Sequence, residues 1–161
     1  MPVTVATPSD TEFSVTRVFN APARLVFDYH TKVEHVKKWQ LGPDGWSMPV
    51  CEIDLRVGGK YHYKWRGDAE GMEFGARGEF KEIVAPTRLV HTESMYGVPG
   101  AEGEVALCTL TFDEKGGRTT LVTTMKFSSK EVRDGAMASG MADGMSTSYD
   151  RMEQAWSKKA A

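Results

Sequence analysis

Two side chains that can exchange protons stand two positions apart in the segment RLVHTES. They are His91 and Glu93. Residues i and i+2 of a β-strand project from the same face, so we expect the two side chains to lie close together. A carboxyl group whose pKa is raised in an apolar cavity can transfer protons near neutral pH, which makes the pair a candidate for acid–base catalysis. The alternative is that this strand face is solvated and the pair has no catalytic role.

Other reactive residue types show no spacing typical of a metal or cofactor site. The histidines lie on different predicted elements, without metal-ligand spacing: His30, His35, His62 and His91. The glycines of RVGGK and DEKGG occupy predicted turns and do not form a P-loop pattern. Cys51 and Cys108 lie in predicted strands, where a reduced thiol is more common than a disulfide. We therefore predict no metal, no cofactor and no disulfide.

A glycine- and methionine-rich segment closes the chain. Ser128 and Glu131 form an S-x-x-E capping box, and the pattern predicts one helix from about Ser129 to Ser157. Three glycines within it, 135, 140 and 144, each cost a helix roughly 1 kcal/mol relative to alanine. Methionines 137, 141 and 145 follow at four-residue steps. Methionine suits adaptable surfaces, so this stripe either packs closely on a sheet or faces a ligand.

The remaining pattern predicts strands and two short helices. Glu12–Phe19 alternates like a strand, Asn20 and Pro22 begin a first helix, and Val33–Trp39 forms a second, which ends at the turn Gly42–Gly45. Strands separated by turns follow as far as the closing helix. The predicted order is β-α-α-β-β-β-β-β-β-α, with about seven strands. This is an α+β fold, with one long helix lying along a curved antiparallel sheet.

Composition excludes several classes of protein. The chain has 161 residues, 40% of them hydrophobic, and a formal net charge of -2. It has no basic block, so nucleic acid is not an expected partner. It also lacks a long apolar run and the pattern of a signal peptide, so we expect a cytoplasmic protein that does not enter a membrane. Length predicts one domain over residues 1–161, with a core from about 13 to 156.

Several strings resemble one known family. They are RVFNAPARLVFDYHT, GPDGWSMPVCEIDLRVGGKYHY, RLVHTES and SGMADGMSTSYDRMEQ. With the element order, they are similar to the Bet v 1-like or START-like (SRPBCC) superfamily, in its branch of activator of heat-shock protein 90 ATPase homologues. The resemblance implies a helix-grip fold with a cavity between sheet and closing helix, in which members hold apolar or amphipathic molecules.

Strand alternation and this resemblance together predict the residues of a ligand-binding wall. For most of them, packing in an ordinary core is the alternative. The predicted set is Trp39, Trp46, Tyr61, Tyr63, Trp65, Met72, Phe74, Phe80, Met125, Phe127, Met141, Gly144, Met145 and Tyr149.

Three functions follow from the resemblance. The first is binding of an apolar or amphipathic small molecule. The second is an enzyme similar to polyketide cyclases and dehydrases, with the same cavity as its active site. The third is a co-chaperone that activates a chaperone ATPase. The co-chaperone of this family has a further N-terminal domain, for which 161 residues leave no room, so a chaperone partner is the weakest expectation.

Overall fold

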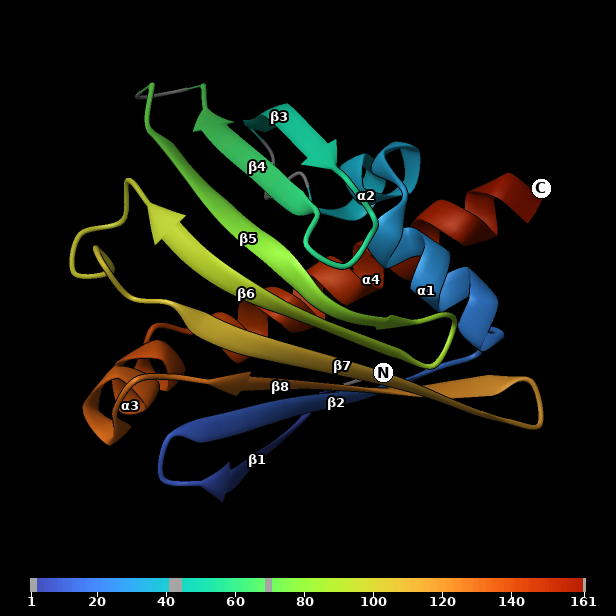
Figure 1. Ribbon diagram of the computed structural model, residues 1–161. Coiled ribbons are helices and arrows are strands. Elements are labelled where there is room, and N and C mark those ends of the chain that lie inside the picture. Colours follow the sequence, from blue (N-terminus) through green and yellow to red (C-terminus); the bar gives the residue numbers. More distant parts are fainter. Residues whose placement is uncertain (1–2, 41–44, 69–70, 161) are drawn as a thin grey trace.

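The computed structural model describes residues 3–40, 45–68 and 71–160 (Figure 1). Within these residues, one antiparallel sheet has eight strands in the order β1-β2-β8-β7-β6-β5-β4-β3. The strands are β1 (Thr4–Ser9), β2 (Glu12–Phe19), β3 (Trp46–Ile53), β4 (Lys60–Gly67), β5 (Glu73–Val84), β6 (Arg88–Tyr96), β7 (Ala106–Lys115) and β8 (Arg118–Lys126). The helices are α1 (Ala23–Thr31), α2 (Val33–Trp39), α3 (Lys130–Ala138) and α4 (Met141–Ala160).

The sheet curves around the C-terminal helix, as the predicted α+β helix-grip fold requires. Figure 1 shows α4 behind the sheet, crossing several strands, while α1 and α2 lie near one end of it. β1 and β3 are the two edges, so the sheet does not close into a barrel. Strands β3 to β8 follow one another as antiparallel neighbours, and β2 pairs with β8. This pairing places the N-terminal and C-terminal halves of the chain side by side.

Alternation sends one face of each strand toward α4. On β2 the inward residues Phe13, Val15 and Phe19 are fully buried, and on β8 Leu121 and Met125 are buried opposite them. The outward face of the sheet is largely polar. The core therefore lies on the concave side of the sheet, where the helices also pack.

The strand β1 was not predicted. Its six residues, TVATPS, are all exposed, so they carry no apolar alternation that could mark a strand. They extend the sheet by backbone pairing with β2, at Thr4–Thr16 and Val5–Val15. An edge strand whose side chains are exposed is held by backbone hydrogen bonds, so its sequence need not show the hydropathy pattern of a buried strand.

The predicted single closing helix is wrong in one respect: it consists of α3 and α4. Gly140 has a φ of +85°, a left-handed conformation that ends α3 and that glycine adopts without steric cost. The N-cap is Ser129, whose hydroxyl accepts from the Val132 amide at 3.2 Å, rather than the predicted Ser128. The Ser128 hydroxyl instead donates to Glu104. Gly140 therefore marks the break between α3 and α4 and does not occupy an interior position of one long helix.

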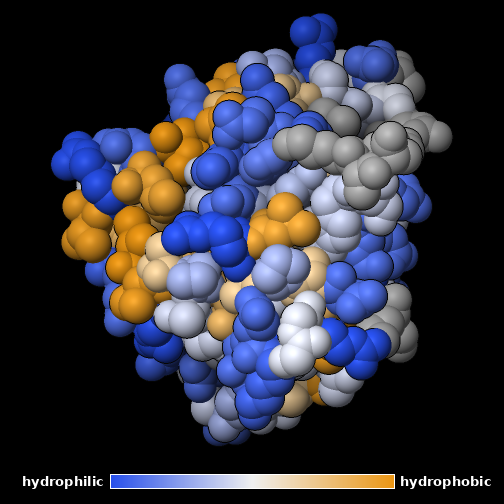
Figure 2. All heavy atoms as spheres, turned by 90° about the vertical axis from the view of Figure 1, so that its right-hand side faces the viewer, coloured by the Kyte–Doolittle hydropathy of each residue, from blue (hydrophilic) through white to orange (hydrophobic). Residues whose placement is uncertain are grey.

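Further expectations concern turns, thiols and membranes. Of the predicted turn at 42–45, residues 42–44 lie outside the described residues. Cys51 and Cys108 are free thiols. No helix in the described part of the chain is both long and apolar enough to cross a bilayer. In the view of Figure 2, hydrophobic surface residues gather mainly toward the left edge, and most of the remaining visible surface is hydrophilic.

Candidate functional site

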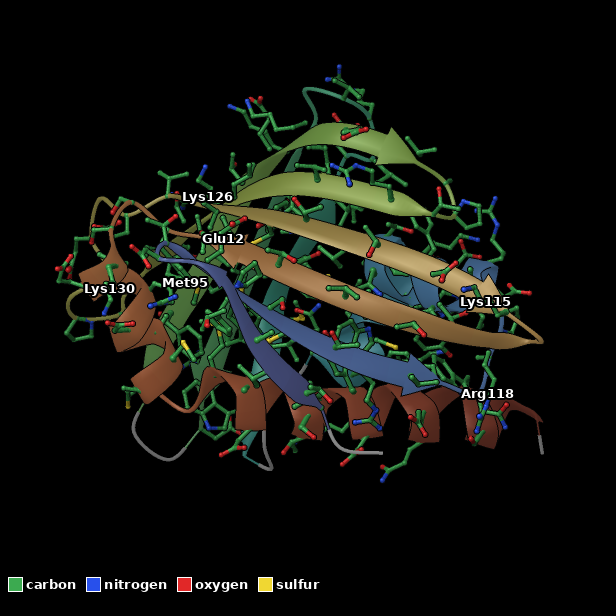
Figure 3. All side chains as sticks on the ribbon, turned by 90° about the horizontal axis from the view of Figure 1, so that it is seen from below. Glu12, Met95, Lys115, Arg118, Lys126 and Lys130 are labelled. Atoms are coloured by element: carbon green, nitrogen blue, oxygen red, sulfur yellow. The ribbon has the colours of Figure 1, made fainter. Side chains whose placement is uncertain are left out.

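A cavity of about 700 Å³ lies between the concave face of the sheet and α4. This volume is in the range of small-molecule sites, roughly 300 to 1,000 Å³. Figure 3 shows α4 running alongside the arched strands, with Met95 toward the end of the sheet near α3, opposite the β7–β8 hairpin that Lys115 and Arg118 mark. Gly144 and Thr147 of α4 line the cavity and are also exposed, so it opens to solvent along α4.

Most of the predicted ligand-binding residues line this cavity. From the sheet and α2 come aromatic residues and one methionine: Trp39, Trp46, Tyr61, Tyr63, Trp65, Phe74, Phe80 and Met125. The helix α4 contributes Met141, Gly144, Met145 and Tyr149. The candidate acid–base residues His91 and Glu93 lie on the same wall.

Two predicted residues lie elsewhere. Met72 precedes β5 and is 53% exposed, because the alternation that would turn it inward begins only with the strand. Phe127 follows the end of β8 and stacks on Phe13, with ring centroids 5.9 Å apart. The methionine stripe is also divided: Met137 of α3 lines a separate small pocket, on the far side of the break at Gly140.

The structure adds lining residues that were not predicted: His30, Gln40, Leu89, Met95, Cys108, Leu110, Thr123, Thr147, Ser148 and Arg151. Alternation contains the signal for those on strands, since Leu89 and Met95 share the inward face of β6 with His91. Cys108 and Leu110 do the same on β7. For His30 and Arg151 no local signal exists, because their helices must first be placed against the sheet.

The polar centre of the sheet wall is the hydroxyl of Tyr61. It donates to the Thr92 carbonyl at 2.8 Å and lies 3.1 Å from Nδ1 of His91 and 3.4 Å from a Glu93 carboxylate oxygen. The tyrosine ring crosses β5 over Gly78 to reach β6, and a Cβ at Gly78 would overlap both this ring and the Thr92 carbonyl. Glycine at 78 is therefore required for the contact between β4 and β6.

The same contact compensates for an irregular stretch of the sheet. Pairing of β5 with β6 runs from Gly75–Tyr96 to Arg77–Ser94 and resumes at Phe80–His91. Between these pairs, the Glu79 amide donates to the Thr92 hydroxyl at 3.0 Å. The Tyr61 hydroxyl satisfies the Thr92 carbonyl, so a side chain takes the place of a ladder hydrogen bond.

His91 and Glu93 both lie next to the Tyr61 hydroxyl, a contact that was not predicted. Nδ1 of His91 lies 3.0 Å from the Thr92 carbonyl, which can only accept, so Nδ1 carries the hydrogen and Nε2 is the acceptor in the neutral ring. Burial, reinforced by the charge of Glu93, raises the pKa of Tyr61 far above its ordinary value. The phenol therefore acts as a fixed donor and not as a base.

His30 adds a second imidazole to the cavity. Its Nδ1 lies 2.8 Å from the carbonyl of Val26, one turn earlier in α1, which again leaves Nε2 as the acceptor. Burial lowers the pKa of His30 to about 4, and the proximity of His91 acts in the same direction. The ring contacts Trp39 and Phe112, with centroids 5.0 and 5.5 Å away. His30 is thus neutral at physiological pH.

Two further titratable groups of the wall, Tyr149 and Cys108, are also neutral. Burial raises the pKa of Tyr149 to about 12, and its hydroxyl lies 3.3 Å from that of Thr123. Burial likewise raises the pKa of the Cys108 thiol well above its ordinary value, and the charge of Glu93 adds to this effect. A protonated thiol is a poor nucleophile, so the site has no activated cysteine.

The helix wall is held in place by a buried cation on β2. The Arg17 guanidinium is inaccessible to solvent and pairs with Asp150 at 2.7 Å and Glu153 at 2.8 Å, both on α4. These carboxylates raise its pKa against the opposing effect of burial. Arg17 also lies 5.4 Å from the centre of the Phe19 ring. The ion pairs fix the position of α4 across the sheet and so shape the cavity.

Fold and cavity together define a helix-grip protein of the SRPBCC superfamily, whose members commonly bind ligands. The model of the family described as activator of Hsp90 ATPase homolog 1-like protein matches residues 20–157. The chain belongs to this family. A search of the curated proteins found no match.

Solved bacterial structures share the fold over nearly the whole chain. A Rhodobacter sphaeroides protein is 25% identical with a TM-score of 0.89, covering 98% of this chain and 99% of its own. A Mycobacterium smegmatis protein is 23% identical with a TM-score of 0.81, covering 95% and 96%. A Nitrosomonas europaea protein is 24% identical with a TM-score of 0.80, covering 96% and 100%.

Proposed function

We propose that this protein binds an apolar or amphipathic small molecule in the cavity between the sheet and α4. The observation that carries the proposal is a cavity of about 700 Å³ whose walls are mostly aromatic rings and methionines. Apolar walls with a few placed polar groups are typical of small-molecule sites. Family membership supports the proposal, because ligand binding is common in this superfamily.

The rim of the cavity favours flat or aromatic ligands. Phe74 of β5 stacks on Trp65 of β4, with ring centroids 5.1 Å apart, and meets Trp46 of β3 edge to face at 5.4 Å. The Trp65 indole donates to the Gln40 carbonyl, which ties this aromatic cluster to the end of α2. Partly exposed rings held in fixed positions offer stacking surface at low entropic cost.

The test is a titration with N-phenyl-1-naphthylamine, a neutral apolar probe that fluoresces when it leaves water. We expect saturable binding near one site per chain. Tyr149→Trp, which enlarges a lining residue, should weaken it, whereas Tyr96→Trp on the outer face should not. A probe that does not saturate, or that binds equally to both variants, would contradict the proposal. Independently of the probe, native mass spectrometry of freshly purified protein would identify the chemical class of any copurified ligand.

A second candidate, an acid–base enzyme acting on a polyketide-like substrate, is favoured by one observation. Two histidines, a glutamate and a tyrosine line the same apolar cavity: His30, His91, Glu93 and Tyr61. For a substrate found by screening, His91→Ala and Glu93→Gln should each lower turnover by about a hundredfold or more while binding survives. His62→Ala, on the outer face, is the matched control. Unchanged turnover in both variants would remove this pair from any mechanism.

A further inference from the structure

Arg151 is a cation at the edge of the cavity, and it has no ion pair with any residue that the structure describes. Among the described residues that line the cavity, it is the only lysine or arginine. In the described part of the chain, its guanidinium has no ion pair and no hydrogen bond. It is partly buried on the wall formed by α4, near Thr147 and Ser148, which also line the cavity. An unpaired guanidinium at the edge of an apolar cavity favours an anion.

The carboxylates nearest in sequence do not neutralise it. Asp150 and Glu153 flank Arg151 on α4, but both turn to the opposite side of the helix and bind Arg17 on β2. Asp150 and Glu153 are therefore paired with Arg17 and not with Arg151. One arginine fixes the helix, and the other remains available to a ligand.

Acceptor groups line the cavity on α1 and on β6. In a neutral imidazole Nε2 is the acceptor at both positions, because Nδ1 of His30 and Nδ1 of His91 each face a backbone carbonyl. The Glu93 carboxylate also lines the cavity, and Tyr61 at 3.4 Å is its one protein donor among the described residues. These acceptors suit a ligand group that carries its own hydrogen.

We infer that the ligand is an amphipathic carboxylate or similar oxyanion whose negative group pairs with Arg151, whose apolar body fills the aromatic cavity, and whose far end carries a hydroxyl group. This inference rests on the proposed function and names its ligand class. A hydroxylated aryl carboxylic acid has this arrangement. The reverse orientation would place the anion against Glu93, which repels it.

The anionic group is tested with two probes that share one framework. N-phenyl-1-naphthylamine is neutral, and 1-anilinonaphthalene-8-sulfonate is the same framework with a sulfonate. In Arg151→Gln, we expect affinity for the sulfonate probe to fall about tenfold and affinity for the neutral probe to stay within about twofold. In the parent protein, added salt should lower the affinity for the sulfonate probe and leave the affinity for the neutral probe unchanged.

Arg118→Gln is the matched control, because it removes the same charge from the β7–β8 hairpin, outside the cavity (Figure 3). It should change neither affinity by more than about twofold, as expected for a distant exposed charge. An equal loss of affinity for the sulfonate probe in Arg118→Gln and Arg151→Gln would overturn the inference. A loss of affinity for both probes in Arg151→Gln would overturn it too. Failure of the neutral probe to bind the parent would instead contradict the proposed function itself.

The hydroxyl group is tested by competition. 2-Naphthoate and 6-hydroxy-2-naphthoate differ only in a hydroxyl at the end opposite the carboxylate, and each can displace the neutral probe. A hydroxyl that finds an acceptor should tighten binding about threefold to tenfold, whereas a buried hydroxyl without one costs affinity. Weaker binding of the hydroxylated compound would overturn this part of the inference.

Discussion

Strand β5 is crossed by a tyrosine on each of its two faces, and the two crossings differ in what surrounds them. On the inner face, Tyr61 of β4 passes over Gly78 to reach β6. On the outer face, Tyr96 of β6 passes over Gly75 to reach His62 of β4, with its hydroxyl 2.7 Å from Nε2. Both glycines make room for a ring that joins two strands across a third.

The difference lies in what a side chain at each glycine would meet. At Gly78 it would meet the Thr92 backbone carbonyl as well as the Tyr61 ring, whereas at Gly75 the nearest atoms all belong to the outer end of the Tyr96 side chain. A backbone cannot move without disturbing the sheet, but a partly exposed ring can turn aside. A side chain larger than glycine is therefore excluded by the backbone on the inner face, whereas on the outer face a movement of the Tyr96 ring can accommodate it. The cavity lies on the inner face.

The largest effect is expected for Gly78→Ala. The added methyl group must displace the Tyr61 ring and the β6 backbone, which combines overpacking with loss of a buried hydrogen bond, about 3 kcal/mol or more in unfolding free energy. Gly75→Ala should cost less than half as much. Urea unfolding of both variants measures this, and equal losses would show that the two faces do not differ.

Next in size is a pH effect from the inner histidine. Burial lowers the pKa of His30 from 6.5 to about 4, so between these values the unfolded chain binds a proton that the folded protein does not. Stability should therefore be complete above pH 6.5 and fall by about 3 kcal/mol as the pH drops to about 4. In His30→Gln this part of the decline should disappear. A parent and a variant with the same pH profile would contradict the burial of a neutral imidazole.

A smaller effect is expected for the two hydroxyl groups. Tyr61→Phe removes the O–H donor of the Thr92 carbonyl, a loss of about 1 to 2 kcal/mol. Tyr96→Phe exposes its former partner His62 to water, so its cost should stay below about 0.5 kcal/mol. Thermal or urea unfolding of the pair gives the comparison. A larger cost for Tyr96→Phe would reverse the assignment of the two faces.

The smallest effect on stability is expected for Gly144→Leu. A Cβ at Gly144 meets no atom within 4 Å, so leucine should raise helix stability by at most about 1 kcal/mol. Because Gly144 lines the cavity, the side chain should also lower affinity for the neutral probe. Gly135→Leu is the control, since its Cβ is equally free but it lies on α3 and does not line the cavity. A clear loss of stability with unchanged probe binding would show that Gly144 serves close packing.

Much of the sheet wall was predictable from period-two alternation. Tyr61, Tyr63 and Trp65 were assigned to one face of β4, and all three line the cavity. The two outliers, Met72 and Phe127, lie just beyond strand ends, where alternation no longer constrains direction. The predicted bounds of α2, Val33–Trp39, agree with the structure, and α1 begins at Ala23, directly after Pro22. The predicted cap at Asn20 is wrong, because Pro22 is the N-cap of α1 and no side chain caps either helix.

The sequence by itself determined which residues share a strand face and which family the chain resembles, because both depend on patterns within short segments. Only the tertiary structure decided which charges meet. Arg17 finds Asp150 across 133 positions of chain, while Arg151, at the cavity, has no ion pair among the residues that the structure describes. His30 likewise becomes a neutral acceptor only once the packing of α1 against the sheet buries its ring. The polarity of the cavity is set by distances between remote segments, and no local pattern encodes those distances.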